Sequence, residues 1–124
     1  MNKQNINENN VENKLEVFKK EACAELHDLA RKLFDIESRL LSDGQFQLAE
    51  LYAVQRLSLF KIIGIIQKSK DEYFHDDFYF YGYHLDNLLE FYKSKRIDKF
   101  VVLVGAAIEA FNNAESILTK GDFI

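Results

Sequence analysis

The chain has 124 residues, of which 48% are hydrophobic and 29% charged, with 11 Phe, 6 Tyr, no Trp and no Pro. This length allows one ordinary domain of about 100–200 residues, which needs neither a disulfide nor a metal to fold. The single cysteine, Cys23, excludes an internal disulfide framework. The absence of proline excludes proline-rich linkers and leaves long helices uninterrupted.

The formal net charge is −4 at pH 7, from 16 Lys and Arg against 20 Asp and Glu. This acidic balance is atypical of a domain that binds duplex DNA through a basic face. The first residues lack the apolar core of a signal peptide. The longest clean apolar run, residues 100–108, is shorter than the about 18 residues of a membrane-spanning helix. We therefore expect a cytoplasmic protein that binds neither nucleic acid nor membrane.

Residues 1–10 are polar and of low complexity, which predicts a disordered tail. From residue 11 to residue 40 apolar residues recur at steps of three and four, which predicts one long helix that ends at a turn containing Gly44. A second helix is expected over residues 45–68. It carries apolar residues on more than one face, so we expect it to lie centrally or to be covered by a second partner. Gly64 lets a neighbouring helix approach it closely.

A polar break at residues 68–71 precedes a third helical segment, whose core face carries Phe74, Phe78 and Leu85. A fourth segment follows the turn at residues 93–98 and ends at Gly121. Short connections force long helices to be antiparallel neighbours. The prediction is an all-α fold: an antiparallel up-down four-helix bundle of two αα-hairpins, forming a single helical domain over residues 11–124.

The third segment holds more aromatic residues than one core face can use. Tyr73, Phe80, His84 and Phe91 share a second helical face, about 100–140° from the core face. Rigid aromatic side chains with partly wetted polar groups are typical of the centres of protein interfaces. The alternative is that the N-terminal helix or the C-terminal residues 122–124 cover this face within the monomer.

These features predict a small acidic protein-binding module, such as a dimeric adaptor, a chaperone or an inhibitor or immunity protein, and not an enzyme. Apolar residues off the core faces of other helices, such as Phe34 and Val102, favour a homodimer, because a second copy hides such faces symmetrically. Carboxylates beside the aromatic face would steer a basic partner. The expected partner-binding residues are Tyr73, Phe80, His84, Phe91, Tyr79, Tyr83, Asp76 and Asp77.

The rival hypothesis is a metal-binding bundle or a metal-dependent hydrolase. Glu72 and His75 have the spacing of one half of a di-iron bundle site, but no second Glu-x-x-His motif accompanies them. The His-Asp dipeptides at residues 27–28 and 75–76 resemble the metal-binding dipeptide of the HD-type phosphohydrolases, which are all-helical enzymes. The chain lacks the small residues that follow the pair in that family, and it is short for that fold.

That resemblance implies a divalent metal that activates water, held by His27, His75, Asp76 and Asp77. The first hypothesis involves no metal ligand and no cofactor. Cys23 and His27 are one helical turn apart, but without an oxyanion loop the thiol is better explained as a packing group. A third possibility is a regulator that contacts nucleic acid through the basic cluster at residues 93–99.

Overall fold

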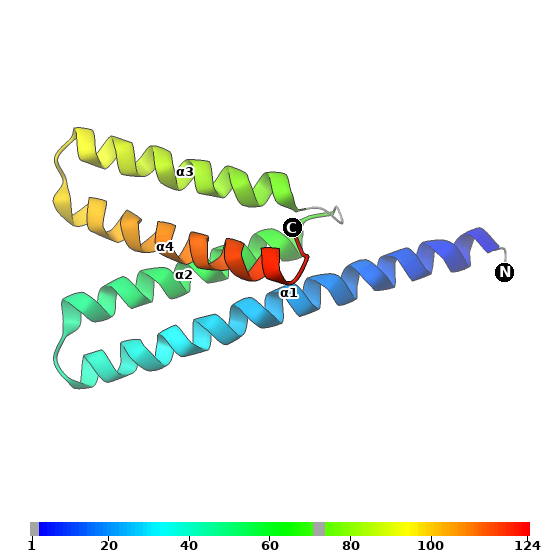
Figure 1. The fold of residues 1–124 in the computed structure, drawn as a ribbon, viewed down its shortest axis with the longest axis horizontal. Coiled ribbons are helices and arrows are strands. Elements are labelled where there is room, and N and C mark those ends of the chain that lie inside the picture. Colours follow the sequence, from blue (N-terminus) through cyan, green and yellow to red (C-terminus); the bar gives the residue numbers. More distant parts are fainter. Residues whose placement is uncertain (1–2, 71–73) are drawn as a thin grey trace.

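The structure of the chain, a computed structural model, describes residues 3–70 and 74–124, with side chains from residue 14 onward within those ranges. Four α-helices make up this part, namely α1 (Lys3–Ser42), α2 (Phe46–Lys68), α3 (His75–Ser94) and α4 (Asp98–Lys120). They form two antiparallel hairpins, α1–α2 and α3–α4, which pack on each other through α2 and α4 (Figure 1). The predicted all-α, up-down four-helix bundle is confirmed.

The N-terminal helix is longer than expected, because α1 begins at Lys3 and not near residue 11. Its first turns project beyond the ends of the other three helices (Figure 1). The backbone of α1 thus runs through residues 3–10 of the segment expected to be a disordered tail, while residues 1–2 lie outside the described part. Further along, the predicted apolar stripe of α1 faces the core, where Ala22 and Leu26 are fully buried.

Residues in the left-handed backbone conformation end three of the helices. In the α1–α2 turn Gly44 has φ of +75°, as predicted. The α3–α4 turn contains no glycine, and Arg96 adopts φ of +57° instead. α4 ends at Lys120 and Gly121 caps it, as predicted, but the left-handed residue is Asp122, since Gly121 has φ of −85°. The turn residues in the sequence therefore mark where the helices end, although at two of the three turns a residue other than glycine is left-handed.

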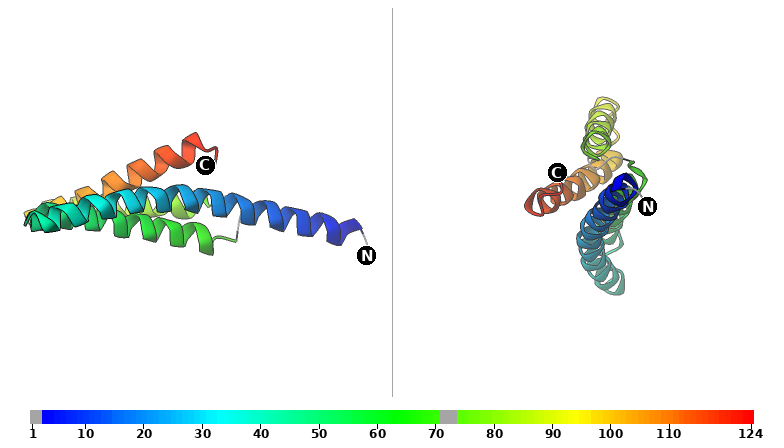
Figure 2. Two further views of the ribbon diagram at one scale, coloured as in Figure 1. Left: turned by 90° about the horizontal axis from the view of Figure 1, so that it is seen from below. Right: turned by 90° about the vertical axis from the view of Figure 1, so that its right-hand side faces the viewer.

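The two central helices of the bundle are α2 and α4. α1 packs mainly on α2 and α3 mainly on α4, whereas α1 and α3 do not contact each other within the helices as described. In the end-on view α3 stands apart from the α1–α2 hairpin (Figure 2). The buried side of α4 is rich in small residues, which let neighbouring helices approach closely: Ala106, Ala107, Ala110 and Ala114.

By length and composition α4 is apolar enough to cross a membrane, with a mean hydropathy of 1.3 over its most apolar window. The core helices of soluble proteins meet the same criterion. In this bundle α4 packs against both α2 and α3 and carries Glu109 and Glu115 within its length. Its apolar residues are therefore explained by packing in the core. The expectation that the protein has no membrane partner stays a prediction.

A buried lysine ties α1 to the end of α2. Lys19 lies on the core face of α1, where only 9% of its surface is exposed. Its ammonium group donates a hydrogen bond to the backbone carbonyl of Ser69, the residue that caps α2. A cation is favourable there, because the last carbonyls of a helix lack partners and carry partial negative charge.

The attachment of α3 to α4 centres on Phe111. Its ring stacks on Phe78, with ring centroids 4.5 Å apart and 17° between the ring planes. A Cβ atom at Gly82 would lie 2.7 Å from the tip of the same ring. Glycine therefore lets the Phe111 ring lie against the backbone of α3. Within α3 only Phe78, Gly82 and Leu85 are buried, so the buried surface of the helix itself is concentrated around this contact.

Replacing Gly82 by Ala should lower the free energy of unfolding by about 1–3 kcal/mol, because the new methyl group overpacks against Phe111. Gly105→Ala is the matched control, since Gly105 is also helical but has nothing within 4 Å of its Cβ position. There alanine should stabilise the chain by up to about 1 kcal/mol through helix propensity. Urea unfolding followed by circular dichroism measures both. Equal changes for the two variants would contradict this role of Gly82.

Candidate protein-binding groove between α2 and α3

An open groove with a volume of about 760 Å³ runs between α2 and α3. It exists because α3 packs on α4 and touches α2 at few positions. At one bridging point the hydroxyl oxygens of Ser58 and Tyr81 lie 2.6 Å apart in a hydrogen bond. The groove is lined from α2 by Lys61, Ile65 and Lys68, and from α3 by Asp77, Phe80, Tyr81, His84, Leu85 and Leu88.

The groove combines an apolar floor with an exposed aromatic rim. Ile65, Leu85 and Leu88 supply aliphatic surface on both sides. Phe80 stands at the rim with 74% of its surface exposed, the highest value among the large hydrophobic residues described. A contiguous apolar surface of this kind on a folded protein is typical of an interaction site.

Charges of opposite sign flank the apolar floor. Lys61 and Lys68 lie on the α2 side, whereas Asp77 lies on the α3 side beside the exposed Asp76. The ion pairs that the described part of the chain does form lie elsewhere, and they are Asp28–Arg31, Glu37–Arg56 and Glu90–Lys93. The three charged groups that line the groove, and Asp76 beside them, therefore have no ion-pair partner among the described residues.

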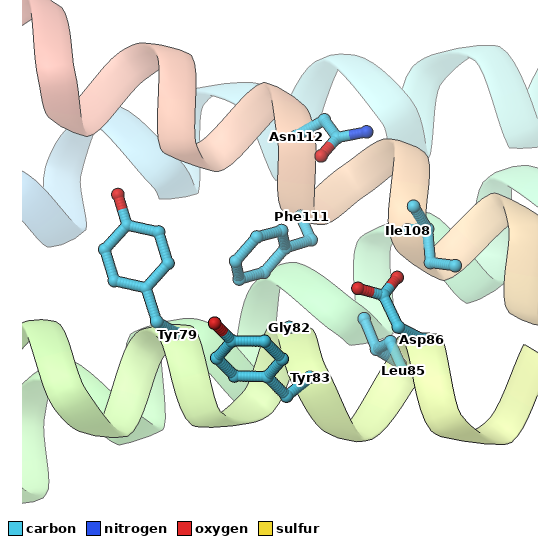
Figure 3. Close-up of a pocket in the computed structure, with 8 residues that line it drawn as sticks. All are labelled: Tyr79, Gly82, Tyr83, Leu85, Asp86, Ile108, Phe111 and Asn112. Carbon is cyan, nitrogen blue, oxygen red and sulfur yellow. The ribbon is translucent and has the colours of Figure 1, made fainter.

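The helix α3 divides the predicted partner-binding residues between two flanks. Phe80, His84 and Asp77 line the groove toward α2. Tyr79 and Tyr83 lie on the opposite flank, in a small hollow between α3 and α4 (Figure 3). The body of α3 thus separates Tyr79 and Tyr83 from Phe80, and the two sets of predicted residues face different neighbouring helices.

The remaining predicted residues lie outside both hollows. Phe91 is half exposed near the end of α3, where its ring meets that of Tyr92. Asp76 is exposed in the first turn of α3. Tyr73 lies outside the described residues. In the hollow toward α4, partial burial and a hydrogen bond with Glu115 raise the pKa of Tyr79.

The C-terminal segment does not cover the second aromatic face. Phe123 is 8% exposed and packs edge-on against Phe18 of α1, with ring centroids 5.0 Å apart. α1 packs mainly on α2, its backbone does not come near that of α3 within the described helices, and toward α3 its Phe18 reaches only Phe74, just before that helix. Phe80 and Tyr83 therefore remain accessible in the monomer.

The residues of the rival metal hypothesis are dispersed. Among the described residues no group of three His, Cys, Asp or Glu side chains could hold a metal ion. His27 is exposed on α1 and lies against Phe60 of α2, with ring centroids 5.8 Å apart. His75 is the first residue of α3 and lies beside Phe74. Glu72 lies outside the described residues, and the metal-dependent hydrolase stays a hypothesis.

Two other candidate features lie away from the groove. Cys23 is buried in the core and His27 is exposed, so the two side chains have different surroundings. The basic cluster at residues 93–99 is exposed in the α3–α4 turn. There Lys93 lies 3.9 Å from a Glu90 carboxylate oxygen and Lys95 lies over the Phe91 ring.

Comparison of the chain with protein-family models, with curated proteins and with solved structures found no match. The functional argument therefore depends on the groove itself. Its α2 side was not foreseen in the sequence, although Lys61, Ile65 and Lys68 recur at steps of four and three along one face. That periodicity identifies a helix face but not the helix that lies opposite it.

Phe80→Ala should change the free energy of unfolding by less than about 0.5 kcal/mol, because the side chain is exposed and supports no core contact. Phe78→Ala, two residues earlier and fully buried, is the comparison variant. Phe78→Ala should lower the free energy of unfolding by about 3–5 kcal/mol, because it removes buried apolar surface and leaves a cavity beside Phe111. Thermal and urea unfolding measure both, and a strongly destabilised Phe80→Ala chain would show that Phe80 belongs to the core.

The buried thiol gives a prediction about pH. Burial raises the pKa of Cys23 above its ordinary value, against a weaker opposite effect of Lys19. The stability linked to this group is therefore present below the ordinary thiol pKa and is lost as the pH rises toward the raised value.

At about pH 8, where a free thiol already reacts, alkylation of Cys23 by iodoacetamide should require opening of the bundle and should accelerate with urea. Tyr83→Cys in a Cys23→Ala background supplies an exposed thiol as the control. Alkylation of the native chain as fast as that of the control would show that Cys23 is accessible.

Proposed function

We propose that this chain is a small acidic protein-binding module that takes a helix of a protein partner into the groove between α2 and α3. Phe80 carries the proposal, because it is 74% exposed at the rim of a groove of about 760 Å³. Burying a phenylalanine is worth about 1.5–3 kcal/mol relative to leaving it in water. A partner that covers Phe80 gains this free energy, because the side chain stays in contact with water in the monomer.

The form of the groove favours a helix as its occupant. Both sides are helices, so the lining residues recur every three or four positions, as Lys61, Ile65 and Lys68 do. An amphipathic helix presents its apolar stripe with the same periodicity and can lay it along such a groove. The apolar floor then supplies affinity, and the side chains above it supply specificity.

The charges at the groove favour a partner helix with one acidic and one basic edge. Lys61 and Lys68 attract carboxylates on the α2 side, and Asp77 attracts a basic group on the α3 side. Complementary charge at the rim of an interface increases the association rate and excludes unsuitable partners. An adaptor, a chaperone and an inhibitor or immunity protein would all act through such a surface.

Photo-crosslinking tests the proposal in cells that produce the full chain. A benzophenone amino acid in place of Phe80 should form a covalent adduct with a protein partner, because this position lies at the groove. The matched control carries the same group in place of Tyr83, which is 69% exposed on the opposite flank of α3. That position should form no such adduct.

A second variant tests whether the adduct depends on the groove. Ile65→Glu places a charge on the apolar floor and should abolish crosslinking from position 80. Circular dichroism of this variant verifies that the helices persist. Adducts of equal yield from both positions, or none from position 80, would contradict the proposed function.

A further inference from the structure

We propose that the helix in the groove is α3 of a second copy of this chain. In the resulting two-fold symmetric dimer, α3 of each copy lies along α2 of the other. This inference rests on the proposed function and names its partner. It also says which face forms the interface of the homodimer. The sequence predicts the homodimer but not where its interface lies.

The charges at the groove complement each other in this arrangement. Lys68 is the last residue of α2 and Asp77 lies in the first turn of α3, so both lie at the same end of the groove. A two-fold axis along the groove turns the second copy over and exchanges its α2 and α3 sides while keeping the ends together. The Asp76–Asp77 pair of each copy then lies over Lys68 of the other. Because the interface is isologous, this contact forms twice.

A glycine on the same side of α2 supports a helix in this position. Gly64 lies between Lys61 and Lys68 on one helical face. Nothing within the described chain comes within 4 Å of a Cβ atom built at Gly64. A glycine in the middle of a helix is less favourable than alanine by about 1 kcal/mol, and the monomer makes no packing use of it. A second helix crossing α2 at this point can approach its backbone closely.

An exposed apolar residue extends the same face of α2. Leu57 is 58% exposed and lies about two turns before Gly64 on that face. α3 has 20 residues, which gives it a length of about 30 Å and, with α2 beside it, a face of about 600 Å². Stable complexes bury about 800 Å² on each partner. The two helices thus provide most of the surface that a dimer needs.

Sedimentation equilibrium of the full chain at micromolar concentration tests the inference. The expected mass is about 29 kDa, twice the 14.5 kDa of one chain. The double variant Lys61→Glu with Lys68→Glu makes both sides of the groove acidic, and Asp76→Lys with Asp77→Lys makes both sides basic. Each should weaken self-association about 100-fold or more, because like charges then face each other in both copies of the contact.

An equimolar mixture of the two double variants should restore the dimer as a heterodimer, because every acidic side then meets a basic one. Recovery also shows that both variants are folded. The control is Lys32→Glu with Lys99→Glu, which makes the same change in net charge at exposed positions outside the groove. This control should dimerise like the parent chain.

Gly64→Ala should weaken the dimer about tenfold, an effect of one methyl group on close helix packing of about 1.4 kcal/mol. The matched variant Gly105→Ala should leave the dimer unchanged. A mixture of the charge variants that stays monomeric overturns the inference. So does a dimer that neither charge variant weakens, since it must use another face.

A parent chain that is monomeric at all concentrations also overturns the inference. The proposed function then stands if position 80 crosslinks to a different protein. It fails if position 80 crosslinks to nothing. The two experiments therefore separate the failure of self-pairing from the failure of the groove.

Discussion

The contact of Phe111 with the backbone of α3 at Gly82 determines the shape of the bundle. In a closed four-helix bundle each helix packs against two neighbours. Here α3 is drawn onto α4, because its one glycine receives the ring that also stacks on Phe78. Little of α3 is left to meet α2, and the hydroxyl pair of Ser58 and Tyr81 bridges part of the gap. The groove is thus a consequence of where α3 is anchored.

The chain fills one gap between its helices and leaves the other open. α1 and α4 also contact each other at few positions, as α2 and α3 do. Near α1 and α4, however, Phe123, the second-last residue, folds back on Phe18 and is almost fully buried. At the α2–α3 groove Tyr81 bonds to Ser58, but Phe80 is left 74% exposed. The open groove therefore does not result from a shortage of apolar side chains.

Most of the fold could be predicted from the sequence, because helical periodicity and short polar breaks are local signals. The periodicity of α3 also separated buried Phe78 from exposed Phe80 correctly. The first residues of the chain carry few apolar side chains and hence no periodic signal, so the apolar pattern of α1 becomes readable only from about residue 11. The groove could be predicted only in part. Helical periodicity gives the angle around the helix axis between Phe80 and Tyr83. It does not give the neighbouring helix that each residue faces, because this depends on how α3 is anchored.

Two electrostatic effects act on the proposed pairing of two copies. The acidic net charge opposes it, and the opposite charges at the groove favour it. Their relative strength depends on the distances between the charges. Each chain carries a formal charge of −4. At physiological salt the Debye length is about 8 Å, so charges spread over the surfaces of two chains are largely screened from each other. In the proposed dimer, a lysine of one copy and an aspartate of the other would lie closer than this length and would be screened much less. In the dimer we propose, local complementarity at Lys68 and Asp77 would therefore outweigh the overall repulsion, and the sign of charge on each side of the groove would select the helix that it accepts.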